Sequence, residues 1–82
     1  MVHVVAAGGD YARFTGGTNE FEVAAATVRE MILALEAQYP GLGDYVESRM
    51  AIAIDGEIHQ DAWGETLGQA SEVYLIPKIG GG

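Results

Sequence analysis

Short stretches of alternating or continuous hydrophobic residues recur along the chain and predict β-strands. They cover residues 2–6, 19–23, 50–54, 57–59 and 73–77. The pair Asp55-Gly56 indicates a type I′ hairpin turn between the third and fourth strands, because both central residues of such a turn have positive φ. Pro77 has no backbone N–H to donate, so we expect strand pairing to end there.

One longer stretch has the period of an α-helix. Its hydrophobic residues follow the i, i+3, i+4, i+7 spacing of a single helix face, at Val28, Met31, Ile32 and Leu35. Thr27 and Glu30 form a capping box, in which the Thr27 hydroxyl accepts from the Glu30 N–H and the Glu30 carboxylate reaches back to Thr27.

The helix is expected to end at Pro40-Gly41, followed by one short turn of helix over residues 42–47. Residues 60–71 are expected to form an irregular connection that crosses the domain, with Trp63 and Leu67 anchored in the core. The element order is therefore β-β-α-β-β-β. It predicts an α+β domain with a mixed sheet and one main helix packed on one face.

Charge narrows the possible partners. The formal charge is −8, from twelve acidic and four basic residues. Such a chain repels nucleic acid and anionic lipid, so we expect neither as a partner, and expect attraction to a basic protein surface instead. There is no cysteine, and no stretch approaches the roughly 20 apolar residues of a membrane span. We expect a cytoplasmic protein without a signal peptide, monomeric when free.

Candidate catalytic groups are few. His3 and His59 are the only histidines, and both fall on predicted strands. The run His59-Gln60-Asp61 places a nitrogen near a carboxylate but matches no metal-binding motif. A domain of this size also leaves little room for a drug-sized pocket. We therefore expect no enzymatic activity from the chain alone, and no bound cofactor or metal.

The C-terminus offers a different chemistry. The chain stops at Gly80-Gly81-Gly82, directly after the last strand, and glycine provides a thin tip without side chains. We expect residues 1–77 to form the folded domain and residues 78–82 a flexible tail. A carboxylate is a poor electrophile, but joining it to AMP supplies a leaving group, and a sulfur donor can then convert it into a nucleophilic thiocarboxylate. Only a thin tip fits a narrow partner site that excludes water.

The chain resembles the ThiS/MoaD family of ubiquitin-like sulfur carriers, which have the β-grasp fold. The resemblance covers almost the whole length and is strongest over residues 54–58 and 72–82. The length is similar to that of the small subunit of molybdopterin synthase. Residues 13–17 and 36–39 are instead similar to a carrier of a cysteine-synthesis route, and Lys78 stands where a second proline is common.

The resemblance implies that Gly82 is adenylylated by a ubiquitin-activating-type adenylyltransferase, which uses ATP, and is then thiocarboxylated, with Gly81 threading beside it. A biosynthetic enzyme would accept the sulfur. The synthesis of molybdopterin is the first candidate route, and the syntheses of cysteine and thiamine are the others. The implied docking surface is an apolar sheet face near the tail, at Ile58 and Ile76 and at the end of the first strand around Val5. The remaining partner-binding positions are Lys78, Ile79 and Gly80.

Two other functions use the same features. A ubiquitin-like modifier would be joined through Gly82 to lysines of target proteins. A non-covalent β-grasp module, resembling the ubiquitin-like domain of phage tail assembly proteins, would not need Gly81 and Gly82. The product formed at Gly82 therefore separates the three functions.

Overall fold

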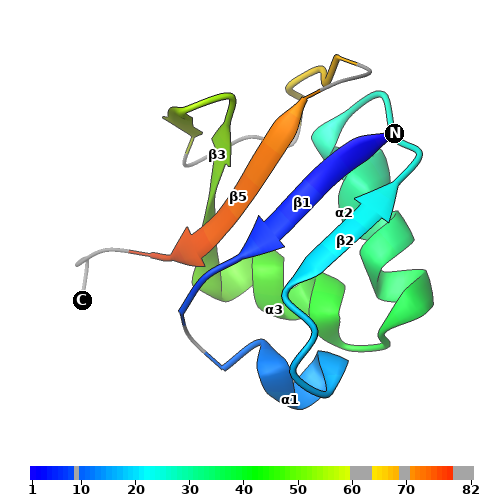
Figure 1. Ribbon diagram of the computed structural model, residues 1–82, viewed down its shortest axis with the longest axis vertical. Helices are drawn as coiled ribbons and strands as arrows, with labels where there is room; N and C mark the ends of the chain where they lie inside the picture. Colours follow the sequence, from blue (N-terminus) through cyan, green and yellow to red (C-terminus); the bar gives the residue numbers. More distant parts are fainter. Residues whose placement is uncertain (9, 60–63, 69–70, 79–82) are drawn as a thin grey trace.

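The computed structural model of the protein describes residues 1–8, 10–59, 64–68 and 71–78. Along these residues the elements are β1 (Val2–Ala6), α1 (Ala12–Thr15), β2 (Glu20–Val23), α2 (Val28–Gln38), α3 (Leu42–Arg49), β3 (Met50–Ile54), β4 (Glu57–His59) and β5 (Glu72–Pro77). The strands form one mixed sheet in the order β2-β1-β5-β3-β4, with α2 and α3 on one face (Figure 1). This is the α+β arrangement expected from the sequence, with α1 and a longer α3 added.

The last strand, β5, lies at the centre of the sheet. It runs parallel to β1, where Val73 pairs with Val4, and antiparallel to β3, where Leu75 pairs with Ile52. Both edges of β5 are therefore paired. The chain leaves the sheet from between two neighbouring strands rather than from a free edge.

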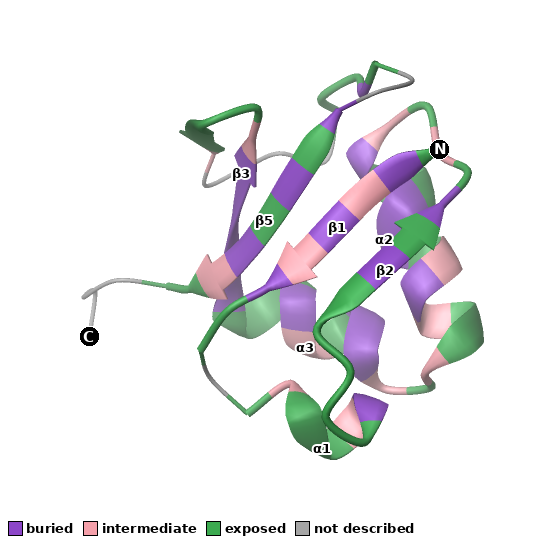
Figure 2. Cartoon of the chain, in the orientation of Figure 1, coloured by how far each residue is buried: buried purple, intermediate pink, exposed green. Residues whose placement is uncertain are grey.

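The core lies between the sheet and the two longer helices. Alternate residues of β1 and β5 are buried, and Figure 2 shows this as purple alternating with pink or green along both strands. The buried side chains that α2 and α3 contribute include Val28, Met31, Ile32, Leu35, Leu42 and Val46. The helix stripe predicted from the sequence is thus the stripe that packs on the sheet.

The start of α2 follows the predicted capping box with one difference. Thr27 Oγ1 accepts a hydrogen bond from the Glu30 N–H at 3.2 Å, as expected. The Glu30 carboxylate, however, accepts from the Ala26 N–H at 2.8 Å and not from Thr27. Thr27 is extended (φ −136°, ψ 162°) and bridged to Thr66, which leaves the N–H of the preceding residue facing the carboxylate.

Helix α3 is longer than the single turn predicted over residues 42–47, because its eight residues continue to Arg49. Its N-cap is Gly41 in the left-handed conformation (φ 95°), which has no side chain to cap the helix. Glu36 of α2 does so instead, since its carboxylate accepts from the N–H groups of Gly41 at 2.8 Å and Gly43 at 2.9 Å. A half-buried carboxylate from one helix thus stabilises the start of the next.

The glycine-rich connection between β1 and β2 contains α1, which the sequence did not reveal. The Phe14 and Tyr45 rings lie 5.4 Å apart between centroids, and the Arg13 guanidinium lies 4.9 Å above the Phe14 ring. Tyr45 Oη also accepts from the Asp10 N–H at 2.7 Å. These contacts attach the connection to α3.

The β3–β4 turn has the predicted geometry, with positive φ at both Asp55 (49°) and Gly56 (88°). Leu67 is buried, as predicted, whereas the other expected anchor, Trp63, lies outside the described residues. Among the described helices, none is long and apolar enough to cross a membrane.

Candidate functional site: the open sheet face and the end of β5

The sheet face opposite the helices carries a row of side chains that crosses all five strands. The strand register aligns Glu20, Val5, Tyr74, Ala53 and Ile58, in that order. A second row, closer to the end of β5, pairs Ile76 with Ala51. Cross-strand neighbours on one face lie about 4.5–5.5 Å apart between Cβ atoms, so the two rows form a continuous surface.

Most of this surface is apolar. Its hydrophobic members, which we call the apolar sheet face, are Val5, Ala51, Ala53, Ile58, Tyr74 and Ile76. Ile58 is 56% exposed and Tyr74 is 42% exposed, although both are large hydrophobic side chains. Such neighbours on one open face are typical of an interaction surface. The structure therefore brings together Ile58, Ile76 and Val5, the positions predicted for docking, and their docking role stays a prediction.

Tyr74 is the member that sequence analysis left out. Along β5, Val73 and Leu75 are buried, whereas Glu72 and Tyr74 are exposed. This alternation is visible in the sequence once the strand is assigned, and it places Tyr74 on the same face as Ile76. What the sequence alone does not supply is the register, which puts Tyr74 between Val5 and Ala53.

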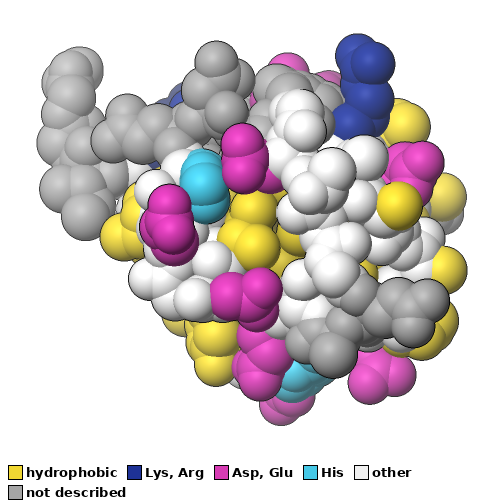
Figure 3. Space-filling view, turned by 90° about the horizontal axis from the view of Figure 1, so that it is seen from above, with side chains coloured by type: hydrophobic (Ala, Val, Ile, Leu, Met, Phe, Trp, Pro, Cys, Tyr) yellow, Lys and Arg dark blue, Asp and Glu magenta, His cyan; other side chains and the backbone are white. Residues whose placement is uncertain are grey.

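Acidic residues lie at the end of the sheet face that is farther from Ile76. His3 is paired with Glu22 on one side and Glu72 on the other. Its Nε2 lies 2.9 Å from Glu20 Oε1, and its Nδ1 lies 3.8 Å from Glu72 Oε1. Acidic side chains are also spread among hydrophobic ones on the side of the molecule shown in Figure 3. This distribution favours a partner whose surface is basic where it meets the acidic end.

The end of β5 is bonded to α3 through Lys78, the last described residue. The Lys78 N–H donates to the Arg49 carbonyl at 3.1 Å, and Lys78 Nζ donates to the Glu47 carbonyl at 3.3 Å. We predicted that pairing would end at Pro77. Strand β5 and its pairing with β3 do end at Pro77, and the Lys78 N–H adds one backbone hydrogen bond beyond the strand.

The other edge of the β5 end is packed by Gly8, just after β1. Gly8 has φ +77°, and a Cβ built on it would lie 3.0 Å from Pro77 Cγ. The neighbouring Ala7 N–H donates to the Leu75 carbonyl at 2.9 Å. Glycine at position 8 thus allows the chain to approach the ring of Pro77 closely.

The other predicted tail residues lie outside the described residues: Ile79, Gly80, Gly81 and Gly82. Their roles in activation and partner binding stay predictions.

Both histidines of the chain, His3 and His59, lie near two carboxylates each. His59 has Glu65 Oε1 at 3.9 Å from Nδ1 and Glu57 Oε1 at 4.0 Å from Nε2. Asp61, the partner suggested by the sequence, lies outside the described residues. Within the part that the structure describes, no group of three or more His, Cys, Asp or Glu side chains is arranged to hold a metal ion.

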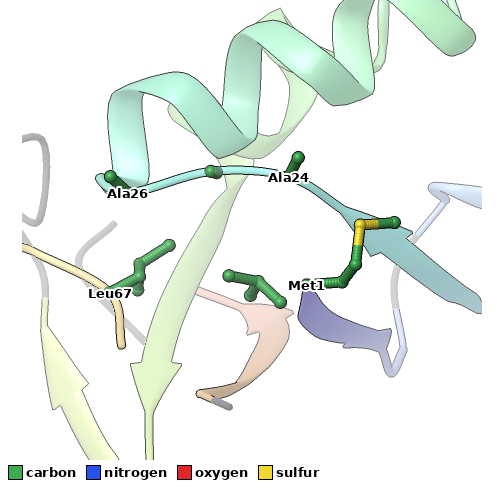
Figure 4. A pocket seen from close by; sticks show the side chains of 6 residues that line it. Met1, Ala24, Ala26 and Leu67 are labelled. Carbon is green, nitrogen blue, oxygen red and sulfur yellow. The ribbon is translucent and has the colours of Figure 1, made fainter. Parts of the chain in front are cut away.

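A pocket of about 420 Å³ lies between the start of β1 and the chain that enters α2 (Figure 4). This volume lies in the lower part of the range of about 300–1,000 Å³ typical of small-molecule sites, but the pocket is widely open to solvent. The lining residues are Met1, Val2, Ala24, Ala25, Ala26 and Leu67. Their side chains supply aliphatic and thioether groups, which provide no general acid, base or nucleophile.

Known proteins share this architecture. The model of the ThiS family matches residues 9–82. A molybdopterin synthase sulfur carrier subunit of Pyrenophora tritici-repentis (strain Pt-1C-BFP) is 33% identical over 72 residues, covering 84% of this chain and 77% of that protein.

Two solved structures are also similar. A chain in the Amycolatopsis orientalis BexX/CysO complex has a TM-score of 0.81 at 20% identity, with 100% of both chains covered. The small archaeal modifier protein 1 of Methanosarcina acetivorans has a TM-score of 0.73 at 24% identity, with 99% of this chain and 95% of that chain covered. These likenesses confirm the ubiquitin-like β-grasp fold.

Proposed function

Because this chain belongs to the ThiS family, we propose that it is a sulfur carrier whose Gly82 carboxylate is adenylylated and then thiocarboxylated. The observation that carries the proposal is the family match, which extends to residue 82 and so includes the glycine tip. The 33% identical relative named as a sulfur carrier subunit supports the same function.

The proposed chemistry has two steps. First, a Gly82 carboxylate oxygen attacks the α-phosphorus of ATP, pyrophosphate leaves, and an acyl-adenylate forms. Second, a sulfide-level donor attacks the acyl carbon and AMP leaves, which gives the thiocarboxylate. Both steps take place in partner active sites, the first in a ubiquitin-activating-type adenylyltransferase. The chain is therefore a co-substrate, and its own residues present the tip and bind the partners.

The fold suits this task because the tip follows the central strand. Docking through the apolar sheet face would bring a partner against Ile76, six residues before Gly82. Gly80 and Gly81 would then thread beside the reacting carboxylate, where a side chain would not fit. ATP and reduced sulfur are both supplied by the cytosol, where we expect the carrier to work.

We propose a molybdopterin-type sulfur acceptor, because the 33% identical relative is named as a molybdopterin synthase subunit. Acceptors of cysteine and thiamine routes are the alternatives. Genes adjacent to the one encoding this chain provide a direct check, since each acceptor class would be encoded by a different neighbour.

Alkylation followed by mass spectrometry tests the carrier function. The protein is isolated from cells that contain its own partners, treated with iodoacetamide, and analysed intact and as a C-terminal peptide. Replacing one carboxylate oxygen by sulfur increases the mass by almost the same amount as oxidation of one methionine, and the chain has three methionines. Alkylation removes this ambiguity, because with no cysteine present an adduct mapped to Gly82 identifies the thiocarboxylate.

The control is the same protein made in cells that lack the adenylyltransferase, which should carry no adduct at Gly82. Gly82 found instead on target lysines would identify a ubiquitin-like modifier. Neither product, in cells whose partners are active, would identify a non-covalent β-grasp module.

A further inference from the structure

The end of β5 is held on both sides, by Gly8 and by α3. On one side, Gly8 packs against the Pro77 ring, with 3.0 Å between Pro77 Cγ and the position of a Cβ on Gly8. On the other side, Lys78 bonds to two carbonyls in the last turn of α3, those of Glu47 and Arg49. The chain is therefore fixed one residue beyond the last strand.

Lys78 is well matched to this position. The carbonyls of the last turn of a helix have no partner within the helix, and they carry the negative end of its dipole. A lysine satisfies them both by charge and by hydrogen bonding. Lys78 is also the single lysine of the chain, and the backbone bond that it makes is one that proline could not make.

We propose that Lys78 is a positioning residue that fixes the base of the tail and so sets the reach of Gly82. This proposal rests on the proposed function. Four residues follow Lys78, and an extended chain spans at most about 3.3–3.6 Å per residue, so Gly82 reaches at most about 14 Å beyond Lys78.

Release of Lys78 from α3 would add one mobile residue, which a partner must order again on binding. Ordering the backbone of one residue changes an equilibrium by roughly five- to thirtyfold. Lys78 is exposed, so we expect a change near the lower limit, about fivefold. The change should appear in the KM for the carrier, because ordering precedes the chemical step, and kcat should change less than about twofold.

Three variants separate the contributions. Lys78→Gly removes the ammonium group and adds backbone freedom, whereas Lys78→Met keeps the side-chain stem and removes only the bond from Nζ. Arg29→Met is the matched control, because it removes one positive charge in the first turn of α2. Each is measured by ATP–pyrophosphate exchange with the adenylyltransferase of the same organism, and hydrogen exchange of the backbone amides is followed by NMR.

We expect the Lys78 amide to be protected in the wild type and in Lys78→Met. We expect KM to rise about fivefold in Lys78→Gly, less in Lys78→Met, and not in Arg29→Met. Protection of the Leu75 amide in every variant would show that β5 is intact.

An unprotected Lys78 amide in the wild type would overturn the proposal, as would a wild-type KM in Lys78→Gly. An equal rise in Arg29→Met would also overturn it, because the effect would then not be specific to Lys78. Absence of exchange activity even for the wild type, with an adenylyltransferase active on another carrier, would instead overturn the proposed function. The amide measurement would still report whether Lys78 is held.

Discussion

Replacing Ile58 by aspartate tests whether the apolar sheet face is a docking surface. Ile58 is 56% exposed in the free protein, and its cross-strand neighbour Ala53 is small. Full burial of an isoleucine side chain contributes about 1.5–3 kcal/mol, so a partner that covers the remaining half gains about 1–1.5 kcal/mol. Aspartate forfeits this gain and adds about 1–3 kcal/mol for a polar group buried without a partner. The binding free energy should weaken by about 2–4 kcal/mol, which raises Kd about 30-fold or more.

The control is Leu33→Asp on α2. Leu33 is 59% exposed, close to the value for Ile58, but it lies on the helix side of the molecule. Both substitutions exchange a half-exposed aliphatic side chain for a carboxylate, and each should lower the free energy of unfolding by a similar amount, about 1–2 kcal/mol. Isothermal titration calorimetry against the adenylyltransferase, and separately against the sulfur acceptor, gives the two dissociation constants.

Only Ile58→Asp should weaken binding. Wild-type affinity of a folded Ile58→Asp variant would refute the assignment of the docking surface. Equal weakening by Leu33→Asp would show that added negative charge, and not the sheet face, is responsible.

Three further predictions follow from the structure. Deleting Gly81 and Gly82 should abolish thiocarboxylate formation, measured by alkylation and mass spectrometry, and leave Tm unchanged; a large drop in Tm would mean that the tail is part of the folded domain. Glu36→Ala should lower the free energy of unfolding by about 2 kcal/mol and Tm by roughly 10 °C in a calorimetric scan, because the N–H groups of Gly41 and Gly43 lose a charged acceptor. An equal loss of stability in the exposed control variant Glu47→Ala would contradict this explanation. With a charge of −8, the association rate with a basic partner surface should fall at least about threefold when salt rises from about 0.05 to 0.5 M, and a rate independent of salt in stopped-flow measurements would exclude electrostatic steering.

Elements with a local cause could be predicted from the sequence. The hydrophobic stripe of α2 and the hydroxyl cap by Thr27 depend on residues within one or two turns of each other. The Asp55-Gly56 turn likewise depends on two neighbouring residues that tolerate positive φ. The glycine tip and the alternation of β5 are local as well, whereas Ile58 and Ile76 were named from the family resemblance.

Features that depend on contacts between distant residues could not be predicted in this way. Glu36 caps a helix that begins at Leu42, and nothing in the spacing of the residues requires this. Lys78 was assigned to the tail because it follows a proline, but the carbonyls that it bonds belong to residues about 30 positions earlier in the chain. The central position of β5 is also a matter of topology, and it decides which hydrophobic residues share the open face.

The proximity of the apolar sheet face to the tail constrains both partners. Ile76 is two residues before Lys78 and six before Gly82, so a reacting carboxylate at Gly82 would lie at most about 22 Å from a docked Ile76. A partner must therefore hold its docking surface and its active site within that distance. If the activating and accepting enzymes both use this face, they cannot bind one carrier at the same time. The carrier must then leave the first enzyme before it meets the second. We therefore expect moderate affinities for both enzymes, together with fast, salt-dependent association driven by the acidic end of the sheet.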